Sequence, residues 1–204
     1  MIAVIDYGVG NLFSLAASLR YIGAESEVTS DINRLKSASA IILPGVGAFA
    51  DAYKKLESSG LVPEIEREVQ SGKPVLGICL GMQLLFDRSF EYGEHRGLGF
   101  IRGDVSPIAP DLKKRLKVPH MGWNSLNFTR PSPLFKYLSG GEDVYFVHSY
   151  YAKNCGDAVT STAEYGGIRL TASVERGNVY GTQFHPEKSG AAGLKILRAF
   201  SELK

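Results

Sequence analysis

Residues 72–86, with the sequence GKPVLGICLGMQLLF, join a buried strand to a helix through a cysteine that has a glycine two positions away on each side. Residues 75–78 are an almost continuous apolar run, which is typical of a strand buried on both faces of a parallel sheet. Helical spacing of apolar residues follows over residues 82–86. The pattern predicts a sharp strand-to-helix turn at Cys79, which lifts this side chain clear of the sheet.

The same order of strand, turn and helix runs through the first half of the chain. Residues 1–5 form an apolar strand closed by Asp6, and apolar residues recur at helical spacing from Leu12 to Ile22. Further strands are predicted over residues 27–29 and 40–43, and further helices over residues 48–56 and 62–69. Alternation of this kind predicts a doubly wound parallel sheet.

Beyond about residue 98 the pattern changes. Short apolar runs over residues 144–147, 158–163, 169–174 and 179–183 are separated by Gly, Asn and Asp, which predicts antiparallel strands and hairpins. An amphipathic helix is predicted over residues 189–203. The expected fold class is α/β: a doubly wound, mostly parallel sheet flanked by helices, with an antiparallel C-terminal extension. Residues 1–204 are expected to form a single domain.

The composition excludes several classes of function. Of 204 residues, 23 are Lys or Arg and 21 are Asp or Glu, and a net charge of +2 is too small to predict a nucleic-acid partner. No run approaches the roughly 20 apolar residues of a membrane helix, and Asp6 interrupts any signal-peptide core. We therefore expect a cytoplasmic protein without a membrane partner, whose two cysteines, Cys79 and Cys155, are reduced.

Two stretches suggest a bound group at first sight. Residues 6–11, DYGVGN, resemble a dinucleotide-binding loop, but the third glycine of that motif would fall at Phe13. His95 with Glu91 and Glu94 fits a polar loop better than a metal site. We expect neither a cofactor nor a metal.

Three residues together fill the roles of a catalytic triad. Cys79 at the predicted turn precedes a helix N-terminus, which favours the reactive thiolate. His185 and Glu187 follow an apolar strand and share one face of an extended segment, so they supply a base and a group that orients it. Two alternatives stay open: Cys79 as a small buried hydrophobe, and Glu187 as a carboxylate that favours a helix dipole.

An oxyanion site is predicted beside the cysteine. Gly45, Val46 and Gly47 end another strand of the same sheet, where glycines leave the backbone free to turn N–H groups toward an oxyanion. The amide of Leu80 is the expected second donor. Gln83 lies on the same helical face as Cys79 and can reach the group that the thiolate attacks. The alternatives are an ordinary turn at Gly45 and an exposed amide at Gln83.

With these motifs in this order, the chain resembles the class I, or triad, glutamine amidotransferases. The resemblance spans essentially the whole chain. Within the family, several stretches resemble the glutaminase subunits that serve histidine biosynthesis. These stretches are residues 6–11 (DYGVGN), 44–47 (PGVG), 97–99 (GLG), 119–124 (PHMGWN) and 145–150 (YFVHSY).

The resemblance implies that glutamine is hydrolysed and that its ammonia passes to a separate cyclase subunit of (β/α)8-barrel type, which makes imidazole glycerol phosphate. Besides Gln83, it assigns the glutamine site to Tyr145, His148, Ser149 and Tyr150. It assigns the partner interface to Asn11, His120, Met121, Trp123 and Asn124. The glycines around Val46 would let the oxyanion peptide turn inward when the ligand-loaded partner binds.

Two other functions remain open from the sequence. The chain could serve a different synthase, such as those for anthranilate, aminodeoxychorismate or pyridoxal phosphate. It could also be a non-catalytic scaffold that keeps the fold.

Overall fold

The structure is a computed structural model that describes residues 1–203. The helices are α1 (Leu12–Tyr21), α2 (Ile32–Ser37), α3 (Phe49–Ser58), α4 (Val62–Gln70), α5 (Leu80–Leu84) and α6 (Gly190–Ser201). The strands of the first half are β1 (Ile2–Ile5), β2 (Ser26–Thr29), β3 (Ala40–Leu43), β4 (Val75–Ile78), β5 (Phe86–Ser89) and β6 (His95–Arg96). Those of the second half are β7 (Ile101–Pro107), β8 (His120–Ser125), β9 (Asn127–Phe128), β10 (Asp143–His148), β11 (Tyr150–Lys153), β12 (Val159–Tyr165), β13 (Ile168–Arg176) and β14 (Val179–Thr182).

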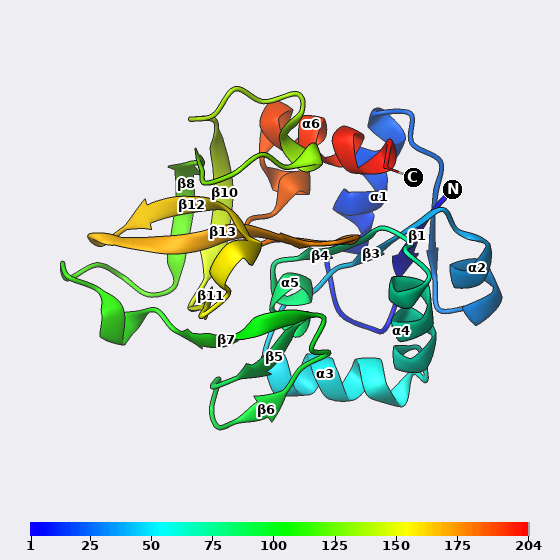
Figure 1. Ribbon diagram of the computed structural model, residues 1–204, viewed down its shortest axis with the longest axis horizontal. Helices are drawn as coiled ribbons and strands as arrows, with labels where there is room; N and C mark the ends of the chain where they lie inside the picture. The colour runs from blue at the N-terminus through cyan, green and yellow to red at the C-terminus, as the bar shows by residue number, and fades with distance from the viewer. Residues whose placement is uncertain (204) are drawn as a thin grey trace.

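An eight-stranded sheet in the order β2-β1-β3-β4-β14-β13-β12-β9 runs through the molecule. The strands from β2 to β14 are parallel, and β13, β12 and β9 continue the sheet in antiparallel pairing. Helices α1 and α6 cover one face of its parallel part, while α3 and α4 lie on the other (Figure 1). This confirms the predicted fold class, including its antiparallel extension.

Two apolar layers hold the helices onto the sheet. On one face, Ile41 and Ile5 pack with Phe49 of α3 and Ile65 of α4. On the other face, Val4 and Ile42 belong to the cluster that includes Leu15 of α1 and Phe200 of α6. Because consecutive strand residues point to opposite faces, continuous apolar runs such as β1 and β3 supply both layers.

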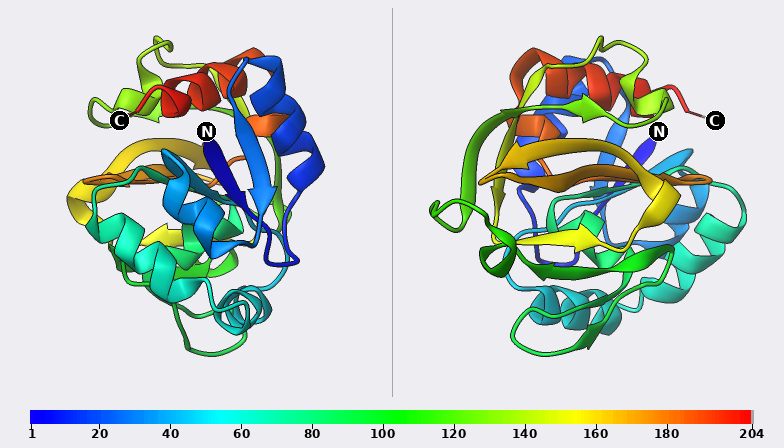
Figure 2. Two further views of the ribbon diagram at one scale, coloured as in Figure 1. Left: turned by 90° about the vertical axis from the view of Figure 1, so that its right-hand side faces the viewer. Right: turned by 60° about the vertical axis from the view of Figure 1, so that its left-hand side comes forward.

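Two small sheets complete the fold. Strands β8 and β10 form an antiparallel ribbon, and β11, β7, β5 and β6 form a four-stranded sheet. Figure 2 shows this second sheet beneath the long β12–β13 hairpin. The sequence pattern did not predict β5 to β9. Strands β5, β6 and β9 have four residues or fewer, and the longer β7 and β8 contain glycines and polar residues that break up any apolar run.

Two predictions of local structure need correction. Residues 179–183 are predicted to form an antiparallel strand, and β14 does pair in antiparallel fashion with β13, but its other neighbour is β4, with which it pairs in parallel, with Thr182 opposite Ile78. The reason is that β13 and β14 form a hairpin whose second strand occupies the open edge of the parallel sheet. The helix after Cys79 was expected over residues 82–86, but it ends at Leu84, and Phe86 begins β5.

Candidate active site

The turn between β4 and α5 holds Cys79 in a conformation that side chains rarely adopt. Its φ of 54° lies in the left-handed region, with a ψ of −110°. The glycines on either side are required by close packing, because a Cβ at Gly77 would lie 2.6 Å from the carbonyl oxygen of Gly81, and one at Gly81 only 1.9 Å from that of Leu43. The predicted sharp turn at Cys79 is therefore present.

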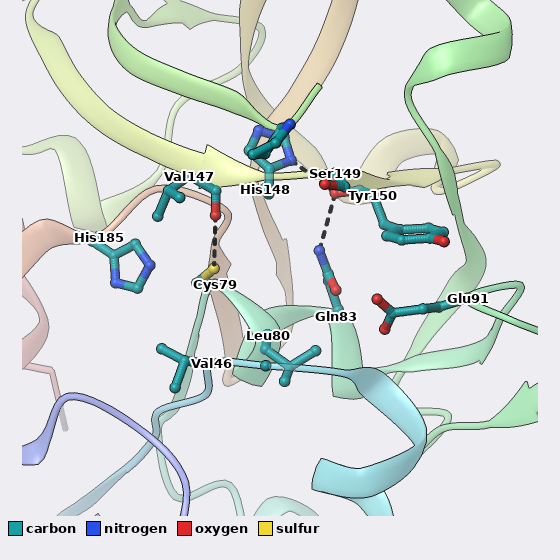
Figure 3. Close-up of a pocket in the computed structure, with 12 residues that line it drawn as sticks. Val46, Cys79, Leu80, Gln83, Glu91, Val147, His148, Ser149, Tyr150 and His185 are labelled. Carbon is teal, nitrogen blue, oxygen red and sulfur yellow. Dashed lines mark hydrogen bonds between the residues drawn. The ribbon is translucent and has the colours of Figure 1, made fainter. Parts of the chain in front are cut away.

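His185 reaches the same place from the neighbouring strand. Because β14 lies beside β4 in parallel register, the segment after β14 ends next to the turn after β4. The backbone N–H of His185 donates to the carbonyl oxygen of Tyr145 at 3.0 Å. Its Nδ1 lies 2.8 Å from Oε1 of Glu187, and both side chains are 3% exposed. Figure 3 shows the imidazole facing the Cys79 sulfur.

The surroundings of His185 favour its protonated form. Burial lowers the pKa of an imidazole, but the interactions with Cys79 and with the Glu187 carboxylate outweigh it and raise the pKa of His185 to about 9. An imidazolium beside a thiolate is the resting arrangement of a cysteine nucleophile with its base. The other cysteine has no such partner, and burial raises the pKa of the Cys155 thiol to about 12.

A pocket of about 300 Å³ opens over Cys79 and His185. Its other lining residues are Val46, Gly47, Leu80, Gln83, Glu91, Pro119, Val147, His148, Ser149 and Tyr150. Figure 3 shows the floor formed by Val46, Cys79 and Leu80, with the segment from Val147 to Tyr150 above it. The pocket has room for a small polar molecule, with the sulfur at one end and the Glu91 carboxylate at the other.

The predicted oxyanion residues occupy different surroundings. Val46, Gly47 and Leu80 line the pocket. Gly47 has a φ of 93°, and a Cβ there would have no heavy atom within 4 Å. A Cβ at Gly45, in contrast, would lie 2.6 Å from the backbone nitrogen of Gly81. Gly45 is therefore needed for close packing against the cysteine turn, whereas at Gly47 glycine is favoured by the positive φ and not by a neighbouring atom.

Most of the residues expected to bind substrate lie at the pocket, with one correction. Gln83, His148, Ser149 and Tyr150 line it, and Gln83 is buried rather than exposed. The side chain of Tyr145 does not line it; the ring packs edge-on against Trp123, with ring centroids 5.9 Å apart. Strand alternation explains the difference, because Tyr145 pairs with Trp123 across the β8–β10 ribbon, on the face away from Phe146 and His148.

Two buried histidines connect the pocket to strand β8. Nδ1 of His148 lies 2.8 Å from the carbonyl oxygen of Tyr150, and its Nε2 lies 3.0 Å from Nδ1 of His120. His120 in turn lies 2.7 Å from Oδ1 of Asn124. Burial lowers the pKa of His120, and it lowers the pKa of His148 to about 3.

The residues expected at the partner interface are divided between surface and core. Met121 and Trp123 are exposed at 61% and 56%, as a binding surface requires, and Asn11 is half-buried. His120 is completely buried, because alternation along β8 turns it inward onto Phe146. The prediction that His120 itself faces a partner is therefore wrong; it can act there only through Asn124.

Sequence reasoning missed four residues of the site. Glu91 comes from a loop without a recognisable motif and was interpreted only as part of a polar loop. Pro119 belongs to the stretch 119–124, which was assigned to the partner interface and not to the pocket. Val147 contributes its carbonyl oxygen, 3.9 Å from the Cys79 sulfur, which no residue type could predict. Gln183 is a fully buried amide just after β14. Its polar side chain in an otherwise apolar strand was the one available signal.

The family comparison agrees with this geometry. The sequence model of the family described as "Glutamine amidotransferase class-I" matches residues 3–202. The chain belongs to the class-I glutamine amidotransferases. It is therefore an enzyme of the glutamine amidotransferase type, with the fold that this family shares.

Relatives among the class-I glutamine amidotransferases carry a more specific name. The chain is 48% identical to an "Imidazole glycerol phosphate synthase subunit HisH" from Caldanaerobacter subterraneus, over 100% of this chain and 98% of the relative. It is 49% identical to a protein of the same name from Moorella thermoacetica, over 99% and 94%. A crystal structure described as "glutamine amidotransferase" superposes with a TM-score of 0.76 at 19% identity over the whole of both chains, which supports the fold alone.

None of the helices within residues 1–203 has the length and apolar character to cross a membrane.

Proposed function

We propose that this protein is the glutaminase subunit of an imidazole glycerol phosphate synthase and acts in histidine biosynthesis in the cytoplasm. It hydrolyses glutamine to glutamate and ammonia, and the ammonia goes to a separate cyclase subunit. The observation that carries the proposal is the pairing of His185 with Glu187 beside Cys79 in one pocket. The names of the full-length relatives supply the acceptor reaction.

In the first half of the reaction, the Cys79 thiolate attacks the side-chain amide carbon of glutamine. The negative charge that develops on the amide oxygen is stabilised by backbone N–H groups of Leu80 and of the 46–47 segment. His185, already protonated beside the thiolate, gives its proton to the amide nitrogen, and the C–N bond breaks. Ammonia leaves, and a glutamyl thioester on Cys79 remains.

In the second half, the neutral His185 removes a proton from water, and the hydroxide equivalent attacks the thioester carbon. The C–S bond breaks, glutamate leaves, and the Cys79 thiolate and the His185 imidazolium are restored. Glu187 stays ionised throughout and holds Nδ1 of His185, so that Nε2 faces the reacting atoms.

The far end of the pocket suits the amino-acid end of glutamine. One oxygen of Glu91 accepts the backbone N–H of Phe49 at 2.5 Å, which anchors the carboxylate. A carboxylate fixed there pairs with the α-ammonium group of the substrate. Glu91 and Cys79 line the same pocket, so in this proposal a glutamine held at Glu91 by its α-ammonium group presents its side-chain amide to the sulfur.

The cyclase is proposed to be a (β/α)8-barrel protein that binds over strand β8 and the pocket mouth. Exposed Met121 and Trp123 supply the large apolar side chains that are enriched at interfaces. Ammonia made in the pocket would then enter the partner without meeting bulk water, where it would be protonated.

The choice of synthase is tested by reconstitution. The chain is mixed with the imidazole glycerol phosphate cyclase, its nucleotide substrate and glutamine, and in parallel with the acceptor subunits of anthranilate and aminodeoxychorismate synthases. We expect a stable complex and glutamine-dependent product only with the cyclase. Product with a different synthase, and none with the cyclase, would contradict the assigned partner while leaving the glutaminase chemistry intact.

A further inference from the structure

A pair of buried glutamine side chains lies behind the Cys79 sulfur. Gln183 is completely buried, and its Nε2 lies 3.7 Å from Sγ of Cys79. Its Oε1 accepts a hydrogen bond from Nε2 of Gln83 at 3.0 Å. Nε2 of Gln83 also donates to the carbonyl oxygen of Tyr150 at 3.0 Å. These contacts join the turn at Cys79 and helix α5 to the end of strand β14 and to Tyr150 above the pocket.

Counting donors and acceptors fixes the orientation of both amides. A carbonyl oxygen such as that of Tyr150 only accepts, so Gln83 must direct its NH₂ group toward it. The second N–H of that group then points at Gln183, which must present its oxygen in return. If the Gln183 amide were reversed, two NH₂ groups would face each other and its oxygen would face the sulfur. The network therefore holds an N–H of Gln183 on Cys79.

The N–H of Gln183 stabilises the thiolate form of Cys79 more than the thiol form. The carbonyl oxygen of Val147, 3.9 Å from Sγ, can accept only from a thiol, whereas the N–H of Gln183 is the stronger partner of a thiolate. Both Cys79 and Gln183 are shielded from water, so the preference is not weakened by solvent. The imidazolium of His185 approaches the sulfur from the pocket, and Gln183 lies on the buried side.

We propose that Gln183 is a further catalytic residue, which stabilises the Cys79 thiolate through its side-chain N–H, and that Gln83 is a positioning residue, which holds this N–H in place. The proposal rests on the proposed function, in which Cys79 is the nucleophile. A hydrogen bond to a charged group stabilises that group enough to change the ratio of thiolate to thiol by about ten- to a hundredfold.

The test measures how fast iodoacetamide alkylates Cys79 across a range of pH, in the full chain carrying Cys155→Ala so that one thiol is counted. Gln183→Met removes both hydrogen bonds, and Gln183→Glu keeps the acceptor for Gln83 but places a carboxylate on the sulfur. Thr182→Val is the matched control. Thr182 precedes Gln183, and its own hydroxyl is buried without a hydrogen-bond partner among the described residues, so the substitution breaks no such contact. Gln83→Met tests the positioning role.

We expect Gln183→Met and Gln183→Glu to raise the alkylation midpoint by about one pH unit or more. We also expect them to lower kcat for glutamine at least about tenfold in the complex with the cyclase. Gln83→Met should shift the midpoint less, in the same direction, and Thr182→Val not at all. The other titratable groups near the sulfur, His185, Tyr7, His148 and Glu91, are unchanged in every variant.

A purely structural role for Gln183 gives a different result. Its variants would then lower the melting temperature while leaving the alkylation midpoint where it is in the control, and this outcome overturns the proposal. Gln183→Met decides the comparison, because the carboxylate of Gln183→Glu would raise the midpoint by charge repulsion whether or not the native N–H acts on the sulfur. If Gln183→Met does not fold, Gln83→Met takes its place, and an unchanged midpoint in that variant overturns the proposal. A Cys79→Ala variant that still hydrolyses glutamine would instead refute the proposed function, whatever the alkylation data show.

Discussion

Nδ1 of His185 lies 2.8 Å from Oε1 of Glu187, and both side chains are almost completely buried. The two residues are only two positions apart, so the geometry is set locally by the turn that follows β14. The pairing directs Nε2 of His185 toward the pocket, where the Cys79 sulfur lies. In the proposed mechanism, this contact orients the base that serves the Cys79 nucleophile.

The nucleophile is tested by small substitutions. Cys79→Ala and Cys79→Ser should abolish glutamine hydrolysis, because both remove the thiolate that is proposed to attack the substrate amide. Both variants should stay folded, since neither side chain is larger than the native one, and ammonia-dependent synthesis by the complex should survive. The measurement is glutamate release together with the melting temperature. Cys155→Ala is the control, and a comparable loss there would point to a role for the second cysteine.

The two partners of the triad should not be equally important. Glu187→Gln keeps the shape of the side chain and one hydrogen bond to Nδ1, so it should lower kcat less than His185→Ala, which removes the base. Steady-state rates in the complex decide this. Equal and complete loss in both variants would indicate that Glu187 mainly stabilises the segment after β14.

Glu187→Gln should also change how the stability of the protein depends on pH. The pKa of His185 is raised to about 9, above its unfolded value near 6.5. Its charged interactions therefore stabilise the fold fully below about pH 6.5 and are lost as the pH rises through 9. Urea unfolding of wild type and Glu187→Gln between pH 6 and pH 10 should show a smaller decline in the variant. A parallel decline in both would show that Glu187 is not responsible.

His148 should make the protein less stable at acid pH, whereas His185 makes it less stable at alkaline pH. Burial lowers its pKa to about 3, so between pH 6.5 and pH 3 the unfolded chain binds a proton that the folded chain does not. As the pH is lowered through this range, the free energy of unfolding should decrease by up to about 1.4 kcal/mol per pH unit because of this group. His148→Gln should flatten the decline measured by urea unfolding. An unchanged slope would mean that His148 is protonated in the folded state.

Gly47 and Gly60 form a matched pair for the oxyanion segment. Both have positive φ, 93° and 73°, and a Cβ at either would meet no heavy atom within 4 Å. Replacement by Ala should therefore cost a similar amount of stability, about 1 to 2 kcal/mol. Only Gly47→Ala should also lower glutamine turnover, because Gly47 lines the pocket. Equal turnover in the two variants would remove the 46–47 segment from the oxyanion site.

The fold was predictable where burial imposes a simple pattern. Strands β1, β3 and β4 are short apolar runs between turn residues, and packing on both faces leaves few other structures for them. Strand β14 looks the same in sequence whichever neighbour it pairs with. Its parallel pairing with β4 depends on the hairpin that precedes it, which local periodicity does not encode.

The site was predictable to the extent that residue type carries the chemistry. Cysteine, histidine and glutamate are recognisable, and the glycines around Cys79 follow from the turn that it needs. Glu91 lies in a loop and Gln183 just after β14, and their places at the pocket and behind the sulfur emerged only from the three-dimensional arrangement. The inward direction of His120 likewise follows from strand alternation, once β8 is known to be a strand.

We propose that glutamine hydrolysis by Cys79 depends on the cyclase partner. In this proposal the peptide beside Val46 turns inward when the partner binds and completes the oxyanion site, and the glycine at position 47 permits this change of backbone conformation. The most direct test is the rate of glutamate release by the chain alone, with the cyclase, and with the cyclase saturated by its nucleotide ligand. Each measurement is repeated with Cys79→Ala. We predict slow release alone, a manyfold increase with the loaded cyclase, and none from the variant. The same kcat alone and in the saturated complex, or release by Cys79→Ala at the wild-type rate, would contradict the account.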